Sequence, residues 1–396
     1  MAGGGEDGTD DGRTEARGPD GEANGRGAEG AEPRHDCVGN GTGDRVGSLS
    51  TADVSVEPYS LPLSRPLSTA RGTIESRRGF LVRVRTEGAV GVGEAAPLPD
   101  FTESYEACEA TLATASDHAA DEGLDAAHHA IDADAHPAAA HGLAAACLDA
   151  VGKAVDQPLY RLLGGEDCGR IPVNAVVGDG DPDQTADRAA AAVEGGFDCV
   201  KVKVGAREPA ADAARLRAVR TAIGSAPTLR ADANGAWSRG QAEAAMEAFD
   251  GLDLQYVEQP LPRGDLQGCG ALRDGPVPIA IDEGLTVHGV DEVLAARAAD
   301  AIVVKPMVHG SPAAALAVAT AALDAGLTAT VTTTVDAVVA RTAAVHVAGS
   351  LPEVTAAGLA TAARLTADLG PDPAPVTDGT IAVPQEPGLG VGEVST

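Results

Sequence analysis

The fold is decided by four segments of one plan: Leu-Arg-Ala-Asp-Ala-Asn-Gly-Ala-Trp (229–237), Tyr-Val-Glu-Gln-Pro-Leu (256–261), Ile-Ala-Ile-Asp-Glu-Gly-Leu (279–285) and Ala-Ile-Val-Val-Lys-Pro-Met (301–307). In each segment a short apolar run ends in an ionisable residue and a turn follows. This pattern is typical of a buried parallel strand that carries a charge at its carboxyl end. The four ionisable residues, Asp232, Glu258, Asp282 and Lys305, are 26, 24 and 23 residues apart. A strand, a loop and a helix need about that length, so the segments predict consecutive strand and helix units.

Eight strand-like runs follow one another at nearly even spacing, with helical patterns between most of them. They cover residues 171–177, 199–204, 228–232, 254–258, 278–282, 301–305, 328–333 and 354–358. Eight parallel strands in this rhythm favour a closed barrel over an open sheet. We therefore predict an α/β fold, a (β/α)8-type barrel, in residues 166–367.

Three further parts are predicted outside the barrel. Residues 1–50 are rich in Gly and acidic residues and contain no aromatic residue, so they are expected to form a disordered acidic tail. Residues 51–165 read as a small α+β domain, in which a loop over 61–72 separates two strand patterns and Ala-rich helices follow. Residues 368–396 are rich in Pro and Gly, and we expect them to pack back on the small domain.

Charge dominates the overall composition, with 59 acidic residues against 29 basic ones and a formal net charge of −30. A surface dense in carboxylates stays hydrated, which is typical of a salt-adapted cytoplasmic protein. Such a surface argues against nucleic acid or an anionic membrane as a partner. We find no signal peptide and no long apolar segment, and six cysteines without a Cys-x-x-Cys pair read as reduced thiols. The oligomeric state stays open, with a homo-oligomer as one option.

Lysine is rare in this chain, and its placement indicates function. Only four of the 29 basic residues are lysines, namely Lys153, Lys201, Lys203 and Lys305, and the other twenty-five are arginines. Three of the four lie within or at the end of apolar strand-like runs, where a lysine without a role is least favourable. We therefore interpret these three as functional.

Five ionisable residues are expected to meet at the carboxyl ends of strands two to five. Lys201 and Lys203 are two residues apart on the second strand, so both side chains face the barrel interior. Asp232, Glu258 and Asp282 end the next three strands, which lie about 4.8 Å apart. Converging carboxylates repel one another unless a cation holds them, and oxygen ligands with room for water and substrate suit Mg²⁺. We therefore predict a magnesium site on these three acids.

Lys305 ends the sixth strand, which lies opposite the second strand in a ring of eight. Lys203 and Lys305 are therefore expected to face each other across a bound substrate as an acid and base pair. A substrate carboxylate that binds Mg²⁺ has a more acidic α-proton, and the cation also lowers the pKa of a nearby lysine. The predicted chemistry is proton removal next to the carboxylate of a small-molecule substrate.

Two neighbours of Asp232 remain undecided from the sequence. Arg230 faces inward and either orients the ligands or neutralises them. Asn234 is equally well explained as a turn residue and as a partner of the site.

Taken together, these residues resemble the enolase superfamily and, within it, the muconate-lactonizing subgroup. The motifs are Lys-x-Lys (201–203), Asp-x-Asn (232–234), Glu-x-Pro (258–260), Asp-Glu (282–283), Lys-Pro (305–306), Gly-Glu-Ala-Ala-Pro-Leu-Pro (93–99) and Gln-Pro-Leu-Tyr-Arg-Leu-Leu-Gly-Gly (157–165). The resemblance implies a modified (β/α)7β barrel with an α+β capping domain. It also implies that the loops 61–72 and 97–104 of this domain close over the barrel mouth.

The sequence is most similar to the o-succinylbenzoate synthase family of menaquinone biosynthesis. That similarity implies a magnesium-dependent lyase that dehydrates 2-succinyl-6-hydroxy-2,4-cyclohexadiene-1-carboxylate. In it Lys203 removes the α-proton and returns it to the departing hydroxyl, and Lys305 stabilises the anion from the other face. Lys201 holds the substrate carboxylate, and Thr333 contacts the substrate.

Two departures from the subgroup concern the substrate pocket. The segment 332–336 carries Asp336 where the subgroup usually has a glutamate, and the segment 357–361 lacks the Asp-x-Asp with which dipeptide epimerases hold an amino group. The second departure argues against dipeptide substrates. The alternatives are an N-acylamino acid racemase or dipeptide epimerase that uses the same two lysines, and a muconate-type cycloisomerase.

Overall fold

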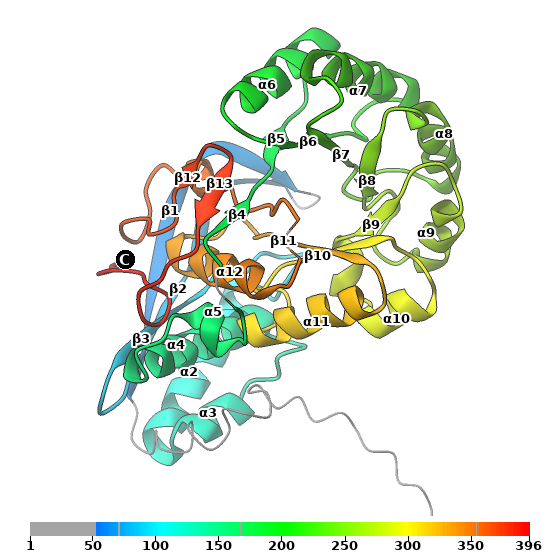
Figure 1. Cartoon of the computed structure of the whole chain (residues 1–396). Helices are drawn as coiled ribbons and strands as arrows, with labels where there is room; N and C mark the ends of the chain where they lie inside the picture. Colours follow the sequence, from blue (N-terminus) through cyan, green and yellow to red (C-terminus); the bar gives the residue numbers. More distant parts are fainter. Residues whose placement is uncertain (1–52, 70–71, 167, 354) are drawn as a thin grey trace, which may run out of the picture. The chain divides into compact units, whose positions relative to one another are not determined.

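The computed structural model describes residues 53–69, 72–166, 168–353 and 355–396, so the acidic tail predicted for 1–50 lies outside the described residues. These ranges contain one seven-stranded parallel sheet, one antiparallel three-stranded sheet and one smaller three-stranded sheet (Figure 1). The five cysteines within them are free thiols, as predicted. None of the helices in these ranges has the length and apolar character needed to cross a membrane.

The antiparallel sheet and four helices form the N-terminal layer. Its elements are β1 (Asp53–Thr69), β2 (Gly72–Arg85), β3 (Val90–Ala95), α2 (Tyr105–Glu122), α3 (Leu124–His129), α4 (Pro137–Ala154) and α5 (Leu159–Leu162). Apolar side chains of β1 and β2 pack against α2 and α4 in one cluster. Helix α4 approaches β3 closely because glycines lie at the contact: a Cβ atom on Gly93 would be 2.0 Å from the carbonyl oxygen of Gly142.

The loop predicted over residues 61–72 is wrong, because β1 continues to Thr69 and β2 already begins at Gly72. Pairing is regular up to Pro62, shifts between Pro62 and Leu67, and then resumes. Proline has no N–H group to donate to a ladder, and a local shift in register accommodates it. The prolines therefore interrupt this hairpin without ending it.

The parallel sheet is the barrel wall, in the order β11-β10-β9-β8-β7-β6-β5. Its strands are β5 (Ala175–Val177), β6 (Cys199–Lys203), β7 (Thr228–Asp232), β8 (Leu254–Glu258), β9 (Ile279–Ile281), β10 (Ala301–Val304) and β11 (Thr328–Val331). The helices are α6 (Pro182–Glu194), α7 (Pro209–Ile223), α8 (Arg239–Phe249), α9 (Leu266–Arg273), α10 (Val290–Ala295), α11 (Pro312–Asp324) and α12 (Val338–Ser350), with short 3-10 turns η1 (Glu283–Thr286) and η2 (Ala362–Arg364). The predicted α/β barrel with an additional α+β layer is confirmed.

Two of the eight predicted barrel strands differ from the prediction. The run 171–177 is divided, because β4 (Arg170–Pro172) pairs antiparallel with β13 (Thr380–Ala382) and only β5 joins the barrel. In the small sheet β13 also pairs with β12 (Val376–Thr377). Of the run 354–358, the described residues 355–358 form only isolated bridges, at 357 and 358.

Isolated bridges close the ring in place of an eighth full strand. They join Val173 with Ala357 and Thr332 with Gly358, so the segment 357–358 connects the end of β11 to the chain before β5. The barrel thus has seven full strands and one reduced strand.

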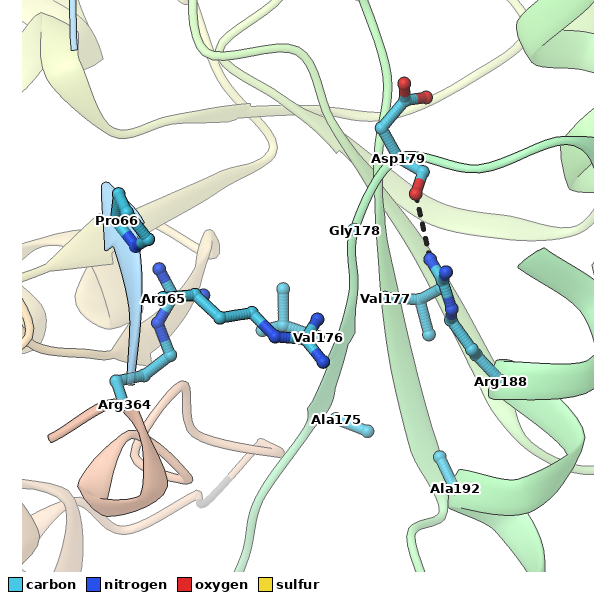
Figure 2. Close-up of a pocket in the computed structure, with 10 residues that line it drawn as sticks. All are labelled: Arg65, Pro66, Ala175, Val176, Val177, Gly178, Asp179, Arg188, Ala192 and Arg364. Atoms are coloured by element: carbon cyan, nitrogen blue, oxygen red, sulfur yellow. Dashed lines mark hydrogen bonds between the residues drawn. The ribbon is translucent and has the colours of Figure 1, made fainter. Parts of the chain in front are cut away.

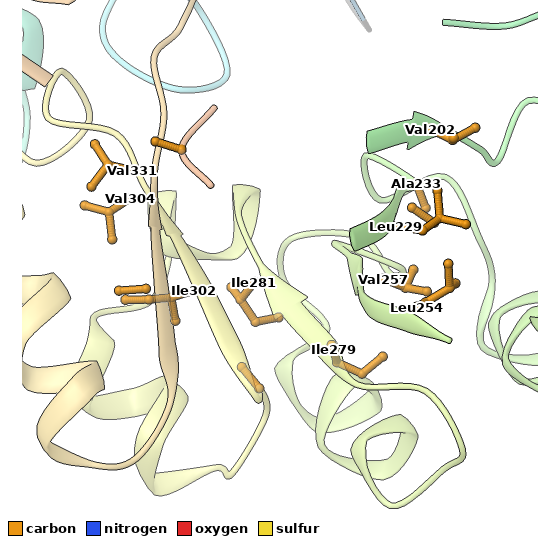
Figure 3. Packing of buried hydrophobic residues seen from close by; sticks show 14 of the residues in the cluster. Val202, Leu229, Ala233, Leu254, Val257, Ile279, Ile281, Ile302, Val304 and Val331 are labelled. Carbon is orange, nitrogen blue, oxygen red and sulfur yellow. The ribbon is translucent and has the colours of Figure 1, made fainter. Parts of the chain in front are cut away.

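The two faces of the barrel wall carry different side chains, because successive residues of a strand point to opposite faces. Branched apolar residues of the strands face the surrounding helices and form the largest core cluster, as Figure 3 shows for Val202, Leu229 and Ile281. Tyr256 and Val303 belong to a separate small cluster. The inner face therefore holds few apolar groups, and the charged residues of the strand ends lie on it.

Glu94 on β3 joins the antiparallel sheet to the barrel. Its carboxyl group is fully buried and accepts hydrogen bonds from the Tyr59 hydroxyl (2.6 Å) and from the backbone N–H groups of Ala337 and Ala340 (2.8 Å each) at the start of α12. Burial, with a further contribution from the negative charge of Asp336, raises the pKa of Glu94 to about 7. Glu94 therefore carries its charge at a cost in stability.

We expect the wild-type protein to lose stability relative to a Glu94→Gln variant as the pH rises from about 4.5 to about 7. In this window the carboxyl group ionises in the unfolded chain but stays protonated in the folded protein. A folded-state pKa of about 7 against an ordinary value of 4.5 corresponds to about 3 kcal/mol. Denaturant titrations of both proteins between pH 4.5 and 8 at fixed ionic strength measure the effect. A difference in unfolding free energy that is independent of pH contradicts it.

Candidate active site

The charged residues predicted at the strand ends lie next to one another at the carboxyl edge of the parallel sheet. In the strand register Lys203 is paired with Asp232, and Asp232 is paired with Glu258. Asp282 and Lys305 directly follow β9 and β10. Because parallel strands end at the same edge, one rim of the barrel carries all five side chains.

Lys201 and Lys203 both contact Asp232. The Lys201 ammonium group lies 2.8 and 2.9 Å from the two carboxylate oxygens of Glu258 and 3.1 Å from Oδ2 of Asp232. The Lys203 ammonium group lies 2.6 Å from Oδ2 of Asp232 and 2.6 Å from Oδ1 of Asn234. The Lys203 side chain is 38% exposed and that of Lys201 only 12%. Lys203 is thus the member of the pair that a substrate can reach.

Lys305 contacts Asp282 and an aromatic ring from the N-terminal layer. Its ammonium group donates a hydrogen bond to Oδ1 of Asp282, and both side chains are buried. It also lies 4.6 Å from the ring centroid of Phe101, within the range of a cation–π interaction. Phe101 belongs to the loop between β3 and α2, and Arg263 of the barrel donates a hydrogen bond of 2.6 Å to the Asp100 carbonyl in the same loop. The predicted loop 97–104 therefore covers the barrel rim at Lys305.

Burial governs the charge state of two of the carboxylates. It raises the pKa of Glu258 to about 7, and the negative charge of Asp232 adds to this effect. Burial also raises the pKa of Asp282, and the positive charge of Lys305 opposes it. Both acids therefore need nearby positive charge to stay ionised.

Asp232 and Lys201 show the opposite balance. Burial acts to raise the pKa of Asp232, but Lys203 and Lys201 outweigh it and hold that pKa below its ordinary value. Burial acts to lower the pKa of Lys201, but Glu258 and Asp232 raise it well above its ordinary value. Lys201 and Asp232 are therefore a fixed cation and a fixed anion.

The donor atoms at this rim suit a hard divalent cation. Asp232, Glu258 and Asp282 offer only oxygen atoms, are at most 6% exposed and hold a concentration of negative charge that lysines balance. Within the ranges that the structure describes, no three His, Cys, Asp or Glu side chains already have the arrangement of a metal site. Lys201 and Lys305 donate hydrogen bonds to carboxylate oxygens of Glu258 and Asp282.

Two residues position the site in ways that single-sequence reasoning did not establish. Gln259, buried and with a φ of +40°, accepts hydrogen bonds from the N–H groups of Asp282 (3.0 Å) and Gly284 (2.9 Å). Asn234, with a φ of +46°, accepts from Lys203 and donates to Glu283 at 2.8 Å. Asn234 is thus both a turn residue and a partner of the site. The Glu-Gln-Pro sequence does not indicate this role of Gln259, because the N–H groups that it binds follow the next strand, β9.

The structure resolves the remaining sequence-based candidates. Arg230 is fully buried and donates to Gln255 (2.7 Å) and to the Ala356 carbonyl (2.7 Å), so it ties the barrel together and none of its recorded contacts is to a carboxylate of the site. Thr333 is buried beyond the end of β11, where its hydroxyl lies 3.3 Å from that of Thr361. Its contact with a substrate stays a prediction.

Comparison with known proteins identifies relatives over most of the chain. The family "Enolase C-terminal domain-like" matches residues 184–392, and the family "MenC, N-terminal domain" matches residues 52–150. The chain is 30% identical over 342 residues to the N-succinyl-L-Arg/Lys racemase of Bacillus cereus, covering 84% of this chain and 92% of that protein. It is 31% identical over 364 residues to the hydrophobic dipeptide epimerase of Enterococcus faecalis, covering 88% and 98%. A solved structure of the dipeptide epimerase of Enterococcus faecalis, complexed with Mg and the dipeptide L-Leu-L-Tyr, aligns with a TM-score of 0.78 at 28% identity and covers 87% of this chain and 100% of that one.

Replacing Gln259 with leucine is expected to lower the free energy of unfolding by roughly 2 kcal/mol or more. The change leaves the buried N–H groups of Asp282 and Gly284 without acceptors, and each unsatisfied group costs about 1–3 kcal/mol. Gln267→Leu is the matched control, since Gln267 is exposed. Thermal and denaturant unfolding measure the difference, and equal stability of the two variants contradicts the positioning role of Gln259.

Proposed function

The chain belongs to the enolase superfamily, and from that premise we propose that it is a Mg²⁺-dependent enzyme that removes the proton α to a substrate carboxylate. The observation that carries the proposal is a row of three buried carboxylates on neighbouring strand ends, with two lysines on the strand before it and one lysine after the strand that follows. Asp232, Glu258 and Asp282 would hold the cation, as oxygen ligands suited to Mg²⁺. When bound, Mg²⁺ supplies positive charge that makes the α-proton of a carboxylate more acidic.

The three lysines then divide the remaining tasks. Lys203, the most exposed of the three, takes the α-proton of the substrate. Lys201 is a fixed cation beside Glu258 and Asp232, so it holds the substrate carboxylate. Lys305 provides positive charge from the far side of the barrel, and Phe101 and the loop around it keep water from that side.

Within this chemistry we infer a lyase, o-succinylbenzoate synthase, acting on 2-succinyl-6-hydroxy-2,4-cyclohexadiene-1-carboxylate. Lys203 removes the proton from the carbon that bears the carboxylate, the bond to the neighbouring hydroxyl breaks, and the returned proton leaves with hydroxide as water. Loss of water makes the ring aromatic, so the reaction needs no oxidant or reductant. The match of residues 52–150 to the MenC N-terminal domain supports this choice, and so does the lack of Asp-x-Asp in 357–361.

A second candidate is racemisation or epimerisation of an N-acylated amino acid or dipeptide. It is favoured by the racemase and the epimerase that are 30% and 31% identical to this chain. In that reaction Lys203 and Lys305 act as base and acid on opposite faces of the substrate. The two candidates thus differ in what they require of Lys305.

We expect the protein with Mg²⁺ to convert the cyclohexadiene substrate into an aromatic product, detected by its ultraviolet absorbance. Chelation of the metal or the Asp232→Asn substitution should abolish the signal, because a carboxylate ligand is lost. Asp183→Asn, an exposed acid on α6, serves as the matched control and should retain activity. Absence of product at both low and high salt would sink the synthase assignment, and full activity of Asp232→Asn after chelation would remove the metal ion from the proposal.

Lysine substitutions should separate the two candidate reactions. Lys203→Ala should lower the rate by 10²–10⁴-fold, on the order expected for loss of a general base. Lys305→Arg should keep substantial synthase activity, since arginine preserves the positive charge, but it should abolish racemisation, because arginine stays protonated and cannot act as an acid or base. Product formation and α-proton exchange in D₂O are measured on the same proteins. A wild-type protein that racemises an N-acylamino acid and loses this activity in Lys305→Arg, without forming the aromatic product, would favour the racemase.

A further inference from the structure

A cavity of about 440 Å³ lies between the β1–β2 hairpin, β5 and the residues that follow it, α6 and η2. Arginine dominates its charged lining, with Arg65 from β1, Arg188 from α6 and Arg364 from η2. In Figure 2 the Arg65 side chain extends from the hairpin toward β5, and Arg364 lies beside it. The cavity thus concentrates positive charge in a chain with twice as many acidic as basic residues.

Two of these arginines have no anionic partner among the residues that the structure describes. Among these residues neither the Arg65 nor the Arg364 guanidinium group has a hydrogen bond or ion pair, and Nε of Arg364 is buried without an acceptor. Asp179, the acidic residue of the lining, is already bound to Arg207 at 3.1 Å and lies 3.7 Å from Arg215. Two unpaired guanidinium groups at one cavity call for an anion.

The backbone holds these two arginines together. Leu63 forms a bridge with Leu365, and the Ser64 hydroxyl donates a hydrogen bond of 2.9 Å to the Ala363 carbonyl. Arg65 directly follows this anchored part of the hairpin, and Arg364 lies between its two anchors. Their proximity is therefore a built feature of the fold.

One wall of the cavity lies one strand away from Lys201 of the proposed active site. Val176, which lines it, is paired in register with Lys201 on the neighbouring strand. Residues paired across parallel strands point to the same face, so the Val176 side chain lies on the inner face with Lys201. Val176 is 51% exposed, although it belongs to the barrel wall. The inner face is thus open to solvent one strand away from Lys201.

We propose that this cavity binds the second, distal carboxylate of a dicarboxylic substrate whose first carboxylate is held at Lys201. Arg65 and Arg364 are the binding residues, because a planar guanidinium group forms paired hydrogen bonds with a carboxylate. The inference rests on the proposed function and assigns the terminal carboxylate of the succinyl chain to this cavity. It makes the cavity the place where a dicarboxylate is distinguished from a monocarboxylate.

A kinetic comparison tests the assignment. The double variant Arg65→Gln with Arg364→Gln is expected to raise KM for the cyclohexadiene substrate by about tenfold or more, with little change in kcat, because charge-assisted hydrogen bonds are lost from binding only. With an analogue whose terminal carboxylate is replaced by a carboxamide, the wild type and the double variant should have equal KM values. Arg85→Gln is the control: it removes one positive charge at an exposed residue that ends β2 and does not line the cavity, so this variant should behave as wild type. Equal KM values of wild type and double variant for the intact substrate overturn the proposal.

A binding measurement tests the cavity independently of turnover. Calorimetric titration with succinate at fixed ionic strength should give binding to the wild type and to Arg85→Gln, and at least about tenfold weaker binding to the double variant. Far-ultraviolet circular dichroism and the unfolding midpoint verify that the double variant is folded. Absence of succinate binding to the wild type, or equal affinity of all three proteins, overturns the proposal. If no substrate is turned over while succinate binding depends on the two arginines, the proposed reaction fails and the anion site stands.

Discussion

Three buried carboxylates at neighbouring strand ends need nearby positive charge to stay ionised. Asp232, Glu258 and Asp282 are almost fully removed from water, and burial alone acts to raise the pKa of each. Lys201, Lys203 and Lys305 provide the compensation through direct hydrogen bonds. Burying these charges costs free energy of folding, and such clusters of buried charges are typical of functional sites.

The same constraint explains why lysine survives here in a chain that otherwise uses arginine. An ammonium group is a compact charge on a flexible chain and can give up or accept a proton, whereas a guanidinium group remains charged. Arg230, two residues before Asp232, shows the contrast: it is fully buried, but it binds Gln255 and the Ala356 carbonyl and acts as a structural link. Lys153 is the structural exception, since it pairs with Asp149 on α4.

The barrel and the charged residues at its strand ends could be predicted from the sequence because their signals are local. An apolar run that ends in a charge identifies a strand, and the spacing of such runs identifies the repeat. The β1–β2 hairpin could not be predicted in the same way, because Pro62 and Pro66 read as a loop while its pairing partners lie on the following strand. Gln259 and Phe101 escaped notice for a related reason, since each acquires its role from a residue on another element.

The rim of charged residues selects a type of chemistry and leaves the choice of substrate to other groups. Any molecule with a carboxylate next to a carbon that bears a proton satisfies the lysines and the acids, and relatives about 30% identical are named for different substrates. Discrimination therefore has to come from groups that contact the rest of the substrate. An apolar wall distinguishes one methylene group by only about 1–3 kcal/mol, whereas a site with a buried polar group strongly rejects a molecule that leaves this group unpaired. The buried nitrogen of Arg364 lies in η2, outside the regular strands of the barrel wall. In the proposed function, substrate preference could therefore change at this position while the lysines proposed to move the proton stay the same.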